Sequence, residues 1–107
     1  MITPPSVGGA LPGLTLKAWA LCSSTGAIIK SYNLNAATHP SAGLYTFTFP
    51  SALTTATYLV RATSAYDGGG LGIFGFSAYT KTTAGFSAAA GIGGANSDIP
   101  FFMEVYE

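Results

Sequence analysis

The sequence predicts an all-β protein: a small antiparallel β-sandwich of about seven short strands with an extended N-terminal arm. Three observations support this fold class. Short segments with alternating apolar and polar residues follow one another, turn residues separate them roughly every 8–12 residues, and no segment has the period of an amphipathic helix. Because 107 residues are expected to form one domain, we assign residues 1–13 to the arm and residues 14–107 to a single sandwich domain.

The arm, "MITPPSVGGALPG", has three prolines and three glycines in 13 residues. Proline cannot donate the backbone hydrogen bond that a helix interior or a central strand requires. A terminus of this composition is expected to be extended and to gain order where a partner holds it. We therefore predict that the arm binds a partner surface through these side chains: Ile2, Pro4, Pro5, Val7, Leu11 and Pro12.

The first strand segment, residues 14–22, reads "LTLKAWALC" and alternates with period 2. The face expected to join the core comprises Leu14, Leu16, Ala18, Ala20 and Cys22. The opposite face holds Thr15, Lys17, Trp19 and Leu21. Residues 27–35, 44–49 and 57–63 are further strand segments, with a loop expected at residues 36–43. The aromatic side chains of residues 44–49 share one face: Tyr45, Phe47 and Phe49.

The second half of the chain has a weaker pattern. Residues 73–80 predict a strand whose central glycine, Gly75, is typical of a bulge or a close backbone approach. Residues 86–98 are rich in alanine and glycine and predict a short strand followed by a long loop. Residues 100–107 predict the final strand. Its two faces comprise Phe101, Met103 and Val105 on one side and Phe102, Glu104 and Tyr106 on the other.

The low charge of the chain argues against several classes of partner. Only 7% of residues are charged, the net charge is zero and the four basic residues are scattered, whereas phosphate contacts need a basic patch. No run approaches the ~20 apolar residues of a membrane span, and a basic amphipathic helix is absent from the pattern. The N-terminus has no signal-peptide pattern. We expect no nucleic-acid and no membrane partner, and assembly in the cytoplasm of a host cell.

No catalytic, cofactor or metal pattern stands out in the sequence. His39 is the single histidine, and the four carboxylates do not cluster with it along the chain. Metal sites need several ligands at fixed spacing, and the G-x-S-x-G motif of many hydrolases does not occur. Cys22 is the single cysteine and is expected in the core. We predict a non-enzymatic protein without cofactor or metal, with His39 in solvent or at a subunit contact.

A surface so short of charge is expected to be covered by other subunits. In residues 14–22 and 100–107, the face opposite the core mixes aromatic with charged side chains, as subunit interfaces do. The predicted interface residues are Trp19, Lys17, Leu21, Phe102 and Tyr106. The alternative is ordinary exposure of scattered apolar residues on a monomer rich in serine and threonine.

Several short motifs occur in a fixed order over roughly residues 16–60. These are K-A-W at residues 17–19, S-Y-N at residues 31–33, then G-x-Y-x-F-x-F at residues 43–49, a bend at residues 51–53, and Y-x-V at residues 58–60. The order resembles that of the small β-sandwich modules in bacteriophage tail-fibre tips and related virion surface proteins. The loop before Gly43 is less polar than in that family, and residues 67–75 have no counterpart in it. The resemblance implies a trimer.

Together, the residues and the resemblance lead to two hypotheses for function. A module with only a short arm favours a trimeric capsid decoration (cement) protein on the outer surface of the virion, whose arm binds the major capsid protein or other virion proteins. The alternative is a tail-fibre tip that recognises a glycan or protein receptor on the host surface, through loop aromatics such as Tyr66, Phe74 and Tyr79. A small enzyme is a third hypothesis without a supporting constellation.

Overall fold

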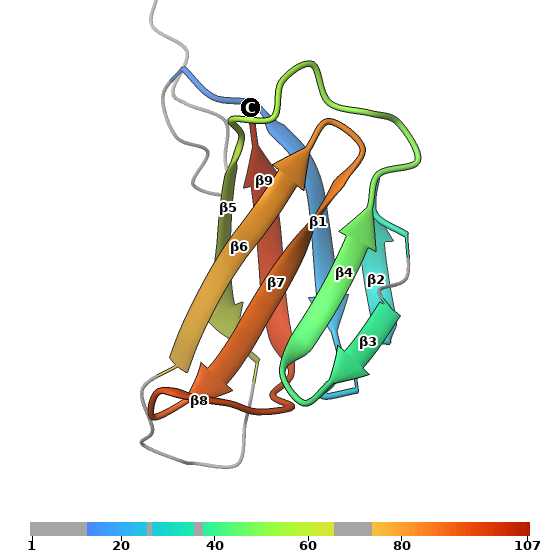
Figure 1. Cartoon of the computed structure of the whole chain (residues 1–107). Coiled ribbons are helices and arrows are strands. Elements are labelled where there is room, and N and C mark those ends of the chain that lie inside the picture. Colours follow the sequence, from blue (N-terminus) through green and yellow to red (C-terminus); the bar gives the residue numbers. More distant parts are fainter. Residues whose placement is uncertain (1–12, 26, 36–37, 66–73) are drawn as a thin grey trace, which may run out of the picture.

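The computed structural model describes residues 13–25, 27–35, 38–65 and 74–107; the predicted arm residues from Ile2 to Pro12, and Tyr66, lie outside this part. The described residues form nine strands and no helix. The strands are β1 (Leu16–Cys22), β2 (Ile28–Tyr32), β3 (Thr38–Ser41), β4 (Leu44–Thr48), β5 (Leu59–Ser64), β6 (Phe74–Thr82), β7 (Gly85–Ile92), β8 (Ala95–Asn96) and β9 (Phe101–Tyr106) (Figure 1). The described part of the chain therefore contains no helix that could cross a membrane.

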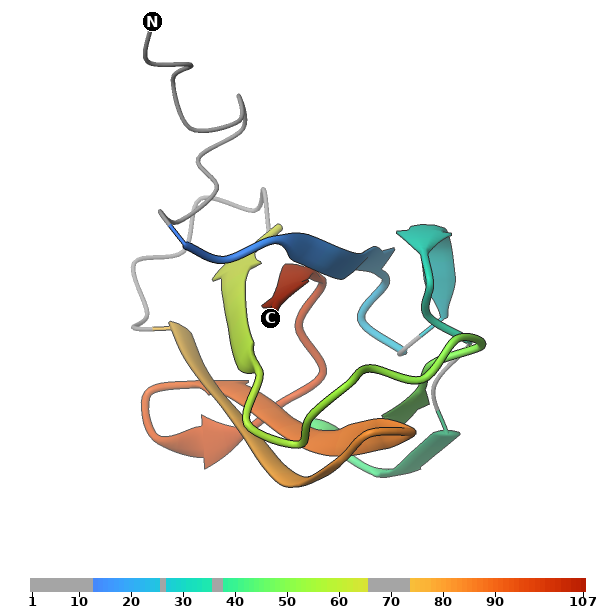
Figure 2. The same cartoon turned by 90° about the horizontal axis from the view of Figure 1, so that it is seen from above.

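The strands form two antiparallel sheets that face each other. Sheet A has the order β2-β1-β9-β5, and sheet B has the order β3-β4-β7-β6, with β8 paired to β7. Seen from above, the two sheets form separate layers (Figure 2). The prediction of an all-β antiparallel sandwich is confirmed.

The core between the sheets consists mainly of aromatic side chains. The alternating face of β4 and its continuation is buried, as predicted, with Tyr45, Phe47 and Phe49 at 6% exposure or less. On sheet A the matching stripe of β9 is Phe101, Met103 and Val105. The Phe101 ring meets Phe47 edge-on, with 6.4 Å between centroids, and Tyr45 at 5.3 Å. Such contacts stabilise the core beyond the area they bury.

Residues 86–98 differ from the prediction of a short strand and a long loop. Most of them belong to β7, a central strand of sheet B that pairs with β4 on one side and β6 on the other. The inward side chains Ala88 and Ala90 are buried and small, which leaves room for the large rings opposite. A Cβ on Gly85 would collide with the carbonyl oxygen of Phe47. The alanines and glycines of β7 thus serve close packing, which no local pattern reveals.

Two smaller corrections concern sheet B. Residues 38–41, expected in a loop, form the edge strand β3 and pair with β4. Gly75 marks no bulge, because it pairs in register with Gly91 and a Cβ there would meet open space. The irregularity of β6 lies further along, between Tyr79 and Thr82, where Thr80 adopts a φ of 51°.

The first strand also differs from its predicted alternation. Ala18, Ala20 and Cys22 are fully buried as expected, but Leu14 and Leu16 are 36% and 37% exposed. The register shifts between Leu16, which opposes Tyr106, and Ala18, which opposes Val105. The extra residue in this bulge is Lys17, and it turns Leu16 to the outer face of the sheet.

Candidate functional site

The outer face of sheet A brings the predicted contact residues Trp19, Leu21 and Phe102 together. Strand register places side chains of this face in rows across the four strands. The first row holds Tyr32, Trp19, Glu104 and Arg61, the second holds Lys30, Leu21, Phe102 and Thr63, and the third holds Leu16, Tyr106 and Leu59. We call this surface the aromatic face.

Large apolar side chains dominate the aromatic face. Tyr32 is 58% exposed and Leu59 is 40% exposed. Trp19, Leu21 and Phe102 are half-buried. The rings of Trp19 and Phe102, on adjacent strands, lie 6.1 Å apart between centroids, and Leu21 is directly opposite Phe102. These three side chains form a contiguous apolar patch that faces away from the protein's own core.

Besides Lys30, which lies opposite Leu21, the patch is flanked by an ion pair whose charges neutralise each other. Arg61 Nε donates to Glu104 Oε1 at 2.9 Å, and the same glutamate accepts from the Tyr106 hydroxyl at 3.0 Å. The Arg61 guanidinium also lies 5.2 Å from the centroid of the Tyr106 ring. The hydrogen bond that Arg61 donates to Glu104 raises the pKa of Arg61 above its usual value. Two ionised groups therefore stand on the aromatic face without adding net charge to it.

Tyr106 corrects one part of the predicted interface. It lies on the outer side of sheet A, but only 1% of it is exposed. Its ring packs under Arg61, and its hydroxyl is bonded to Glu104. Its own chain thus covers it, and it offers almost no surface to a second subunit.

Lys17 is separated from the aromatic patch by the β-bulge. It lines a pocket of about 470 Å³ at one end of the sandwich, which we call the end pocket. The other lining residues are Tyr32, Asn33, Pro50, Ser51, Ala52, Leu53, Thr54 and Glu107. They come from the start of β1, the end of β2, the connection between β4 and β5, and the C-terminal residue, so sequence proximity could not have grouped them.

Two side chains hold the walls of the end pocket. The Asn33 amide donates to the carbonyl oxygens of Lys17 and Ser51 and accepts from the Ser51 N–H at 2.9 Å. Glu107 Oε2 accepts from the N–H groups of Thr54 at 2.9 Å and Thr55 at 2.8 Å. Hydrogen bonds from Thr54, and then from Thr55, hold the pKa of Glu107 below its usual value. The connection is thus fixed to both β1 and the chain terminus.

His39 has a partner inside its own chain, which the sequence pattern did not predict. Its Nε2 lies 2.8 Å from Asp98 Oδ1, and its ring stacks on Tyr45 with 4.8 Å between centroids. The same Asp98 oxygen accepts from the Gly43 N–H at 2.8 Å. This bond, followed by the one to His39, lowers the pKa of Asp98. The arrangement ties the β8–β9 connection to the β3–β4 turn.

The described residues contain no cluster of metal-ligating side chains. Within them, no three His, Cys, Asp or Glu side chains lie close enough to hold a metal ion. Burial raises the pKa of the Cys22 thiol to about 12, so it stays protonated and weakly nucleophilic at neutral pH.

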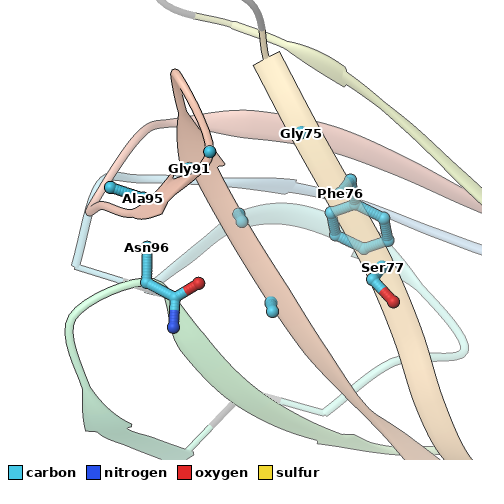
Figure 3. A pocket seen from close by; sticks show the side chains of 9 residues that line it. Gly75, Phe76, Ser77, Gly91, Ala95 and Asn96 are labelled. Carbon is cyan, nitrogen blue, oxygen red and sulfur yellow. The ribbon is translucent and has the colours of Figure 1, made fainter.

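Of the aromatic residues suggested for receptor binding, Tyr66 lies outside the described residues, and Phe74 and Tyr79 both lie on β6. Phe74 packs against the core, whereas Tyr79 is 44% exposed on sheet B. A second pocket of about 230 Å³ lies beside Phe76 on that sheet (Figure 3). Its other lining residues are Gly75, Ser77, Ala89, Ala90, Gly91, Gly94, Ala95 and Asn96. Small side chains give this pocket few groups with which to recognise a ligand.

Comparisons with protein-family models, with curated proteins and with solved structures found no match for this chain.

Proposed function

We propose that this protein is a non-enzymatic structural protein of a bacteriophage virion, a homotrimer that decorates or cements the outer surface of the capsid. The observation that carries the assembly role is the aromatic face, with its contiguous patch of Trp19, Leu21 and Phe102. The virion setting and the trimer rest on the resemblance of residues 16–60 to tail-fibre tip modules. The arm is the proposed contact with the capsid.

The contrast between the two sheets supports a specific interface. The outer side of sheet B presents mostly short side chains, such as Ser77 opposite Ala89 and Gly75 opposite Gly91, with Tyr79 as a large exception. The aromatic face instead offers apolar anchors beside an ion pair. Apolar anchors in a contact supply binding free energy, and the charges around them set the register. One side of the subunit contact is therefore expected to lie on the aromatic face.

A trimer places a geometric condition on this contact. In a ring of three subunits the contact is heterologous, so the aromatic face of one subunit meets a different surface of the next. A dimer would instead bring two aromatic faces together. Sedimentation equilibrium of the full chain distinguishes the two, and a monomer at micromolar concentration would contradict the assembly role altogether.

Trp19→Ala tests the proposed interface. Since Trp19 is half-buried on the outer face, its truncation should leave a folded monomer and weaken association by about 2 kcal/mol, or roughly 30-fold. Phe102→Glu places a charge in the same patch and should have the same effect. Tyr79→Ala, on the opposite sheet, is the matched control. Unchanged sedimentation of both patch variants, with native circular dichroism, would refute this interface.

Host recognition by a tail-fibre tip is the second candidate, and the end pocket is the observation that favours it. Cryo-electron microscopy of a purified virion separates the two candidates directly. Density for the module on the capsid lattice supports the decoration role, whereas density confined to the tail fibres supports the tip.

A further inference from the structure

The end pocket has the position and size of a small-molecule site. The C-terminus, the start of β1 and the β4–β5 connection lie at the same end of the sandwich (Figure 1). The pocket between them has a volume of about 470 Å³, within the range of roughly 300–1,000 Å³ of small-ligand sites. It is therefore large enough for about one or two pyranose rings.

The pocket is also held in shape before any ligand arrives. Asn33 has a φ of 53°, a left-handed conformation that costs a non-glycine residue free energy. Its amide offsets that cost by bridging Lys17 and Ser51. Glu107 Oε2 fixes the far end of the same connection. Pre-formed walls reduce the entropy lost on binding.

Some polar atoms of the lining residues take no part in the hydrogen bonds that hold the pocket walls. Within the described residues, neither Lys17 Nζ nor Glu107 Oε1 has a hydrogen-bond or ion-pair partner. Beside them Tyr32 is 58% exposed, although aromatic rings are usually buried. The pocket thus combines a donor, an acceptor and an accessible aromatic ring.

The chemistry of these groups selects among ligand classes. A simple anion would be attracted by Lys17 but repelled by Glu107. A simple cation would be attracted by Glu107 but repelled by Lys17. A purely apolar ligand would desolvate both charged groups without replacing their hydrogen bonds. A neutral ligand rich in hydroxyl groups can accept from Lys17 and donate to Glu107. If it also has a face of C–H groups, it can pack on Tyr32.

We propose that the end pocket is a saccharide-binding site. The Tyr32 ring packs against a pyranose face, and Lys17 and Glu107 bind hydroxyl groups of the sugar. The serine and threonine side chains of the lining complete the contacts. This proposal rests on the host-recognition candidate, and it requires that Tyr32, on the edge strand β2 of the aromatic face, stays accessible when subunits associate.

Binding to an array of neutral and N-acetylated pyranose oligosaccharides, followed by calorimetry with the best-bound glycan, tests this site. Wild-type protein should bind, and Tyr32→Ala and Lys17→Met should each lower the affinity by about tenfold. Tyr79→Ala is the matched control, because it removes an exposed tyrosine from the other sheet. It should bind the glycan as tightly as the wild type. Tyr32→Phe should retain most of the affinity, which keeps the test valid if Tyr32→Ala does not fold.

The same experiment separates this site from the proposed assembly function. Phe102→Glu should lose self-association but keep saccharide affinity, because Phe102 neither lines the pocket nor pairs with Tyr32. Two results would overturn the proposal: no glycan bound by the wild-type protein across the array, or a glycan whose affinity is the same for Tyr32→Ala, Lys17→Met and the wild type.

Discussion

Single residues in this protein are constrained most where backbones approach each other. Gly43 has a φ of 70°, and a Cβ there would collide with the carbonyl oxygen of Ala90. Its N–H also donates to Asp98, and its carbonyl accepts from the Ala90 N–H at 2.8 Å. Only glycine meets both requirements without strain.

Gly43→Ala is therefore expected to lower the free energy of unfolding by about 1–3 kcal/mol, because of the left-handed φ and the collision together. Urea unfolding followed by circular dichroism measures the change. Gly75→Ala is the matched control, since a Cβ there meets open space, and it should be neutral or stabilising by up to about 1 kcal/mol. Equal losses in the two variants would contradict this explanation.

At the scale of elements, one acidic side chain links two connections of the fold. Asp98 precedes β9 and accepts hydrogen bonds from Gly43, in the β3–β4 turn, and from His39 on β3. Its carboxylate form is favoured in the folded protein, so its pKa is lower there than the ordinary value of 3.8. A group whose pKa falls on folding stabilises the fold above its unfolded pKa.

The pH dependence of stability follows from this fall in the pKa of Asp98 on folding. The contribution of Asp98 should be complete above about pH 5 and decline as the pH falls below about 4, toward the folded pKa. Asp98→Asn should be less stable than wild type at pH 6, and the difference should shrink at pH 3. Glu107→Gln is measured in parallel, because the pKa of Glu107 is also lowered. A difference independent of pH would contradict the role of the Asp98 charge.

For the whole molecule, the two outer surfaces have different characters. The aromatic face carries several exposed apolar side chains, whereas the outer side of sheet B carries mostly short ones apart from Tyr79. With only 7% charged residues, the chain has few groups to keep such a surface in water. The proposed subunit contact through the aromatic face is our explanation for this asymmetry.

Removal of residues 1–13 tests the division into arm and module. Because Thr15 still pairs with Glu107 through both backbone hydrogen bonds at 3.0 Å, the truncated protein should melt within a few degrees of the full chain. It should, however, no longer attach to capsids in a co-sedimentation assay. Attachment that survives the truncation would place the capsid contact elsewhere.

Local patterns were reliable where a strand has one buried and one exposed face. The stripes of residues 44–49 and 100–107 were predictable, because their side chains alternate and tertiary context did not shift them. Trp19, Leu21 and Phe102 were predicted together on the same reasoning, and they are neighbours. Tyr106 lies on the predicted face, but its burial was not foreseen, because it depends on Arg61 from another strand.

The sequence by itself determined the all-β class, the core stripes and the low-charge surface, since alternation and composition are local properties. Only the tertiary structure decided the bulge at Lys17, the central place of β7 and the meeting of Lys17, Tyr32 and Glu107 in the end pocket. Each of these depends on which strands pair and in what register. Pairing is set by long-range packing of the two sheets, and a short stretch of sequence carries little information about it.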